Sequence, residues 1–109
     1  MPTNYKVLGQ SNPSATTATT LYTVPAATQA VVSTITVCNQ ASSAATYRVA
    51  VRIAGAALAA AQYIAYDVSL PGNATDTLTL GVTLGATDVI TVYSSNATTS
   101  FNAYGSEIS

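Results

Sequence analysis

Hydrophobic and polar residues alternate along much of the chain in short stretches, which is the spacing of side chains on a half-buried β-strand. The cleanest alternation covers residues 46–53 and places four apolar side chains on one face: Tyr47, Val49, Val51 and Ile53. Similar stretches predict further strands at residues 20–24, 63–68, 76–84, 88–93 and 100–105, while residues 5–10 are expected to be an arm or edge element. No long amphipathic helical pattern interrupts this series.

Residues 29–39 are almost entirely β-branched, and branched side chains fit a pleated strand better than a helix. Strict alternation assigns them to two faces, with Val31, Ile35 and Val37 on one and Val32, Thr34, Thr36 and Cys38 on the other. Alternate threonines here and at Thr75, Thr77 and Thr79 predict cross-strand threonine pairs on a solvated face. An array that orders water, as in ice-binding proteins, is the alternative.

Turn-forming residues separate the expected strands. Pro71 and Gly72 predict a type II turn with a positive φ at Gly72. Residues 54–62 (AGAALAAAQ) are too few for a stable free helix, so we expect a turn or a loose strand of small residues. Residues 1–17 are expected to form an N-terminal arm or edge segment, and residues 18–109 a β-sandwich domain.

Short strands at this spacing predict an all-β fold. The expected architecture is a single antiparallel β-sandwich of about seven or eight short strands, either immunoglobulin-like or jelly-roll-like.

Charged residues are scarce: three Lys or Arg and four Asp or Glu in 109 residues, with a net charge of −1 and no histidine. The lack of histidine excludes Ser-His-Asp and Cys-His catalysis and imidazole metal sites. A lone Cys38 and dispersed carboxylates offer no other metal or acid–base site, so we expect no enzymatic activity, no metal and no cofactor. Three scattered cations make no nucleic-acid-binding face, and no apolar stretch is long enough to span a membrane. Weak charge repulsion favours assembly with other subunits.

Tyrosines and arginines are the candidate contact residues, because they combine large apolar or planar groups with hydrogen-bonding tips. Tyrosine pairs suit protein contacts or sugar stacking, and the alternative is that they close the ends of the core. Arg48 and Arg52 share a strand face and are expected either to contact a neighbouring subunit or to pair with Asp67. The candidate interface residues are Tyr5, Lys6, Arg48, Arg52, Tyr63, Tyr66, Phe101 and Tyr104.

Six segments of the chain share a pattern with one known group of proteins: residues 21–25, 33–39, 47–52, 63–67, 84–93 and 100–108. They include the strings TVP, YIAYD and SFNAYGSE, which are moderately specific as a set. Together these segments resemble small virion structural proteins of tailed phages, notably those that infect cyanobacteria. The resemblance implies a non-enzymatic β-sandwich on the virus particle. Residues 84–93 followed by Phe101 also resemble the closing strands of trimeric jelly rolls of the tumour-necrosis-factor and complement type, which implies a homotrimer.

The sequence therefore favours a capsid decoration (cement) protein that binds the major capsid protein or other virion proteins and stabilises the shell. A tail, neck or fibre-associated module that contacts a host receptor is the alternative. Since no signal peptide is visible, we expect synthesis in the host cytoplasm and residence in the virion. We also expect that removal of residues 1–17, as an arm able to add to a partner sheet, weakens particle binding more than it lowers the melting temperature.

Overall fold

Strands lie where the alternating and β-branched stretches predict them in the computed structural model, which describes residues 3–109. Two short 3₁₀ turns, η1 (Ile53–Gly55) and η2 (Ala60–Gln62), lie between β4 and β5. The strands are β1 (Thr3–Ser11), β2 (Thr19–Thr23), β3 (Gln29–Asn39), β4 (Ala45–Arg52), β5 (Tyr63–Leu70), β6 (Thr75–Leu84), β7 (Val89–Ser94) and β8 (Thr99–Ile108).

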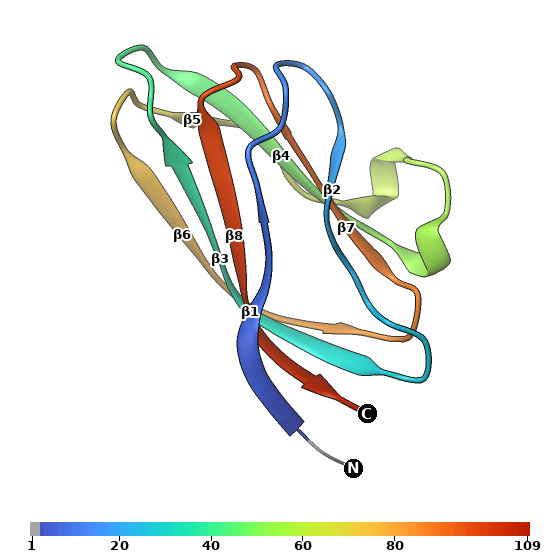
Figure 1. Ribbon diagram of the computed structural model, residues 1–109. Coiled ribbons are helices and arrows are strands. Elements are labelled where there is room, and N and C mark those ends of the chain that lie inside the picture. The colour runs from blue at the N-terminus through green and yellow to red at the C-terminus, as the bar shows by residue number, and fades with distance from the viewer. Residues whose placement is uncertain (1–2) are drawn as a thin grey trace.

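The strands form two four-stranded sheets that pack face to face (Figure 1). The first sheet has the order β1-β8-β3-β6 and the second the order β2-β7-β4-β5, with every neighbouring pair antiparallel. This order is that of a jelly roll, in which the chain crosses repeatedly between the sheets. The predicted all-β antiparallel sandwich is confirmed, and the topology is jelly-roll rather than immunoglobulin-like.

Apolar side chains from the inner faces of both sheets form one core between the layers. The Tyr47 and Phe101 rings meet edge to face there, with 6.2 Å between their centroids. The Tyr47 hydroxyl donates a hydrogen bond to Asp76 at 2.9 Å, which joins β4 to β6 at one side of the sandwich. The largest apolar members of the core are Tyr47, Phe101, Ile35, Leu70, Ile90, Val24, Val32, Val37, Val49 and Val92.

A β-bulge in β3 changes which of its side chains enter the core. Val32 lies opposite Gly105 and Thr34 opposite Tyr104, so Ser33 is an extra residue with no partner on β8. An extra residue reverses the alternation, and Val32 is therefore buried with Ile35 while Val31 lies on the outer face. The strict two-face assignment of this strand was wrong for Val31 and Val32. Beyond the bulge, Thr34 pairs with Thr79 and Thr36 with Thr77, as predicted for a solvated face.

The N-terminal segment is part of the sandwich within the described residues. β1 pairs with β8 from Thr3 to Ser11, so of the two alternatives, a free arm or an edge segment, residues 3–11 are an edge strand of the first sheet. After the strand, the Asn12 side chain donates hydrogen bonds to the Ala97 and Thr99 carbonyls at 3.1 and 2.8 Å. Residues 1–2 of the predicted arm lie outside the described residues.

Two predicted turns differ from expectation in their details. Between β5 and β6 the left-handed residue is Asn73, at φ 54°, and not Gly72. Gly72 is required for a different reason, because a Cβ there would collide with the Ser42 carbonyl. Ile53 does not extend β4 inward; it starts η1 and is exposed.

Candidate functional site

All seven charged side chains have a partner within the chain. Lys6 pairs with Glu107 and Arg48 with Asp67, while Asp76 accepts the Tyr47 hydroxyl hydrogen bond. Arg52 donates to the Gly55 and Ala56 carbonyls at 2.9 and 2.7 Å, and to Thr91 at 3.3 Å. Asp88 accepts from the backbone N–H groups of Ala54 and Gly85 at 2.8 and 2.9 Å. The outer surfaces between these groups present mainly neutral side chains.

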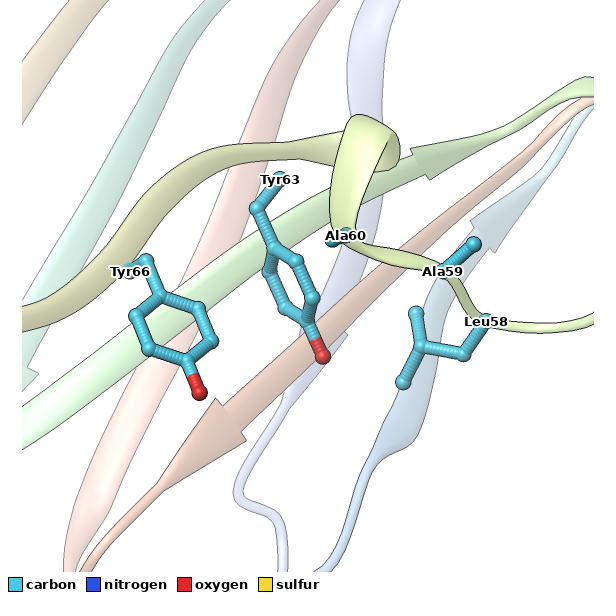
Figure 2. A pocket seen from close by; sticks show the side chains of 5 residues that line it. All are labelled: Leu58, Ala59, Ala60, Tyr63 and Tyr66. Atoms are coloured by element: carbon cyan, nitrogen blue, oxygen red, sulfur yellow. The ribbon is translucent and has the colours of Figure 1, made fainter.

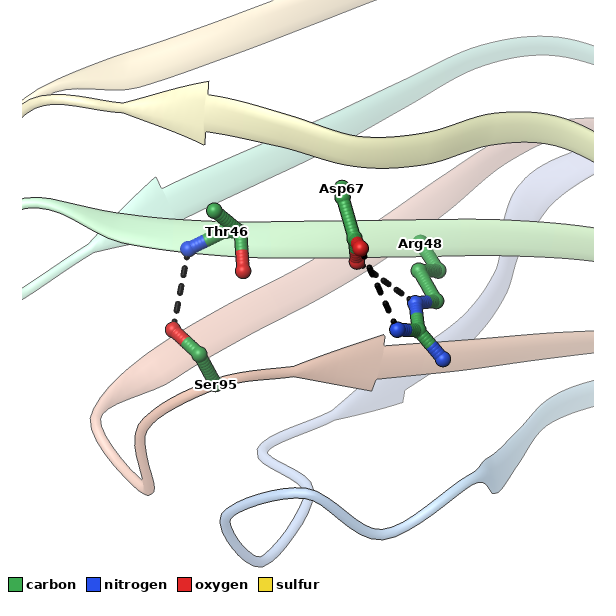
Figure 3. A network of polar contacts seen from close by, with 4 residues as sticks. All are labelled: Thr46, Arg48, Asp67 and Ser95. Atoms are coloured by element: carbon green, nitrogen blue, oxygen red, sulfur yellow. Dashed lines mark hydrogen bonds and ion pairs between the residues drawn. The ribbon is translucent and has the colours of Figure 1, made fainter.

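Arg48 organises a cluster on the outer face of the second sheet. Its Nε donates to Asp67 Oδ1 at 2.6 Å and its Nη2 to Asp67 Oδ2 at 3.2 Å, a bidentate arrangement (Figure 3). The guanidinium also lies 4.2 Å from the ring centroids of both Tyr66 and Tyr93, which come from the strands on either side. The hydrogen bond to Asp67 raises the pKa of Arg48 above its usual range. We call Arg48, Asp67, Tyr66 and Tyr93 the Arg48 cluster.

A bulge in β5 brings Tyr66 and Asp67 together on this face. Tyr47 pairs with Val68 and Val49 with Ala65, so Tyr66 and Asp67 both lie opposite Arg48. Asp67 has a left-handed φ of 50°, a conformation that aspartate tolerates better than most residues. In a regular strand these two adjacent side chains would point to opposite faces. The bulge therefore places both the Tyr66 ring and the Asp67 carboxylate in contact with Arg48.

The segment between β4 and β5 projects from the sandwich (Figure 1). Polar side chains hold it in place. Arg52 binds the carbonyls of Gly55 and Ala56, and Asp88 binds the N–H of Ala54. Gln62 accepts from the Ala59 N–H at 2.7 Å and donates to the Ala57 carbonyl at 2.9 Å. A run of small residues with little packing of its own thus has a defined shape.

A hollow of about 560 Å³ lies between this segment and β5, lined by Leu58, Ala59, Ala60, Tyr63 and Tyr66 (Figure 2). We call it the Leu58 hollow. The Tyr63 and Tyr66 rings meet at 81° with 4.9 Å between centroids, and their hydroxyls point the same way in Figure 2. Tyr66 is 58% exposed and belongs to both the hollow and the Arg48 cluster.

The first sheet carries a second exposed patch on its outer face, which we call the Tyr5 face: Tyr5, Val7, Val31 and Tyr104. Val7 lies directly opposite Tyr104, and Tyr5, which lies opposite Ser106, is the diagonal neighbour of Tyr104. Tyr5 is 84% exposed, the most of the large hydrophobic residues that the structure describes as exposed. The hollow among these residues measures about 580 Å³; Lys6 also lines it, with its ammonium group paired to Glu107.

The eight candidate interface residues fall into four environments. Tyr5 and Tyr104 share the Tyr5 face, and Lys6, which lines the same hollow, pairs with Glu107 at 2.9 Å. The prediction that Phe101 makes contacts with a partner was wrong, because its ring is fully buried against Tyr47. Phe101 and Tyr104 lie on opposite faces of β8, since three residues along a strand reverse the side-chain direction.

The second sheet brings the remaining candidates together. Arg48, Tyr63 and Tyr66 meet around the Arg48 cluster and the hollow, and Arg52 holds the adjoining segment. The sequence left two partners open for Arg48, a neighbouring subunit or Asp67, and the structure shows the pairing with Asp67. Sequence reasoning missed Tyr93 and Leu58. Tyr93 could have been predicted from the sequence, because the alternation of β7 places it on the same outer face as Arg48.

Comparisons with known proteins give a fold and no family. No protein-family model matches the chain, and no curated protein matches its sequence. Among solved structures, it is similar to a chain in the structure of infectious bursal disease virus Gx strain, with a TM-score of 0.53 and 8% identity. The match covers 97% of this chain and 31% of the viral chain. At this identity the likeness establishes the fold alone. In the part of the chain that the structure describes, no helix has the length and apolar character to cross a membrane.

Proposed function

We propose that the chain is a non-enzymatic structural protein of a virus particle, and specifically a capsid decoration protein that binds the outer shell. Its partner would be the major capsid protein or a neighbouring virion protein, and its own assembly a homotrimer. A jelly roll is a common architecture of viral capsid domains, although a fold alone does not assign a function.

The observation that carries the proposal is the internal pairing of every charged side chain. An interface that buries an unpaired ion loses about 3–5 kcal/mol of binding free energy. Since the charges of this chain are already satisfied, its outer faces can be covered by a partner without that loss. The Tyr5 face combines such neutrality with exposed aromatic and aliphatic groups, which are typical of the buried centre of an interface.

Imaging of particles made with and without the protein tests the proposal. We expect its density on the outer shell and a lower temperature of particle disruption when it is missing. The double variant Tyr5→Ser, Val7→Ser should bind shells more weakly while its melting temperature stays close to that of the parent. Ile53→Ser, which changes an exposed apolar residue outside the Tyr5 face, is the matched control. Density confined to the tail would refute the decoration role.

A tail, neck or fibre-associated module that contacts a host receptor is the second candidate. The Leu58 hollow favours it, because an aromatic-lined hollow beside the Arg48 cluster offers a site that binding to a shell does not require. Particles labelled on the tail alone, together with binding of the free protein to host cells, would favour this candidate over the first.

A further inference from the structure

We propose that the Leu58 hollow is a saccharide-binding site that takes one neutral pyranose ring. This goes beyond a structural role in the particle and applies whether the protein lies on the shell or on the tail. The hollow of about 560 Å³ lies within the range of small-ligand sites, roughly 300–1,000 Å³.

The site is built before any ligand arrives. Four of the seven charged side chains act around it: Arg48 and Asp67 at the cluster, and Arg52 and Asp88 on the segment of residues 53–62. Gln62 adds two hydrogen bonds to the backbone of the same segment. Arg52 and Asp88 thus fix the start of the segment that forms one wall of the hollow, and Arg48 lies against Tyr66 on the other side. Preorganisation of this kind reduces the entropy lost when a ligand binds.

The lining has the mixed character that a sugar ring requires. A pyranose presents an apolar face of C–H groups and a periphery of hydroxyls, and tyrosine offers a ring face and a hydroxyl in one side chain. Because Tyr63 and Tyr66 meet at 81°, they form a corner in which a pyranose chair can place its C–H face on one phenol ring and its edge against the other. The Ala59 and Ala60 methyls leave space opposite this corner, and Leu58 closes it (Figure 2).

Hydrogen-bonding groups for sugar hydroxyls lie beside the corner. Arg48 uses Nε and Nη2 for Asp67, while its Nη1 makes no hydrogen bond among residues 3–109. The Asp67 side chain is 44% exposed and its oxygens can accept further hydrogen bonds. Since the two charges neutralise each other, the site selects neither an anion nor a cation. Neutral, hydroxyl-rich ligands therefore fit it best.

Saturation-transfer difference NMR on the full chain tests this proposal, with methyl α-glucoside, methyl α-galactoside, methyl α-mannoside and N-acetylglucosamine as probes at millimolar concentration. We expect saturation transfer to the C–H groups of at least one probe. Tyr63→Ala, which removes one side of the corner, should weaken binding by about tenfold or more, equivalent to ~1.4 kcal/mol. Tyr5→Ala, an exposed tyrosine on the other sheet, should leave it unchanged.

Ala60→Trp gives an independent variant, because it fills the hollow without removing a contact from the fold. It should abolish saturation transfer while the circular dichroism spectrum stays that of the parent. No transfer to any probe, or equal transfer to the parent and Ala60→Trp, would overturn the proposal. So would a parent oligomer that dissociates in Tyr63→Ala, since the hollow would then be a subunit contact. Particle imaging does not depend on these results, so failure here leaves the decoration role standing.

Discussion

Tyr22 and Glu107 connect the two sheets through a short hydrogen bond of 2.5 Å between the phenol and a carboxylate oxygen. Tyr22 lies on β2 in the second sheet and Glu107 on β8 in the first, and Lys6 on β1 pairs with the other carboxylate oxygen at 2.9 Å. Burial, and then the hydrogen bond to Glu107, raise the pKa of Tyr22 above its usual range, so the phenol stays protonated and donates. Three strands are thereby joined at one side of the sandwich.

Tyr22→Phe should lower the free energy of unfolding by about 1.5–3 kcal/mol, the range for a lost hydrogen bond to a charged group. The phenylalanine ring keeps the packing of Tyr22 in the core but leaves Glu107 with one donor fewer. Urea unfolding followed by circular dichroism measures the change. Tyr104→Phe is the control, because that tyrosine is exposed on the outer face. This variant should unfold at the same urea midpoint as the parent. Equal losses in both variants would contradict a specific role for the Tyr22 hydroxyl.

Acid should destabilise the fold through Glu107. The hydrogen bonds from Tyr22 and then Lys6 lower the pKa of this carboxyl below its ordinary value of about 4.3. A group with a lowered folded-state pKa stabilises the protein above its unfolded-state pKa, and this contribution is lost as the pH falls through the folded value. We expect the free energy of unfolding to be level above about pH 5 and to fall in more acidic solution. Urea titrations at a series of pH values measure this decline, which should be shallower in Glu107→Gln. If the free energy of unfolding of Glu107→Gln fell as steeply with pH as that of the parent, another group would be responsible for the acid sensitivity.

The elements of this fold were predictable from sequence because each strand carries its own pattern. Alternation over residues 46–53 and the β-branched run of residues 29–39 place β4 and β3 without tertiary information. Which side chains of β3 enter the core could not be predicted in the same way, since a single extra residue at Ser33 reverses the alternation. The bulge depends on close approach between β3 and β8, which no local pattern records.

The candidate site was only partly predictable for the same reason. Tyr66 and Asp67 share a face through a second bulge, and strict alternation separates them. Phe101 and Tyr104 are three residues apart and so lie on opposite faces of β8, but which of the two faces meets the core depends on how the first sheet packs against the second. Composition identified the residue types that make contacts, but their grouping required the register of neighbouring strands.

Gly105 should tolerate no side chain, whereas Gly81 should accept one. A Cβ on Gly105 would collide with the Val31 carbonyl beside the β3 bulge, and a Cβ on Gly81 would meet no atom within 4 Å. Gly105→Ala should therefore cost about 1–3 kcal/mol or more through forced backbone shifts. Gly81→Ala should change stability little or raise it by about 0.4–1 kcal/mol, because alanine restricts the unfolded chain. Thermal unfolding of the two variants side by side decides this, and similar melting temperatures would show that the bulge adapts.

Deletion of residues 1–17 should destabilise the free protein, in contrast to the expectation for a separable arm. The deletion removes β1, its ladder to β8 and the Lys6 partner of Glu107. It also uncovers the β8 edge, and an uncovered edge strand pairs readily with other chains. We expect a lower melting temperature in calorimetry together with self-association in sedimentation velocity. Lys6→Ala, which removes the ion pair and keeps the strand, separates the two causes: it should lower the melting temperature less and remain unassociated. A truncated chain that melts with the parent and loses only particle binding would show that β1 detaches freely from the sandwich.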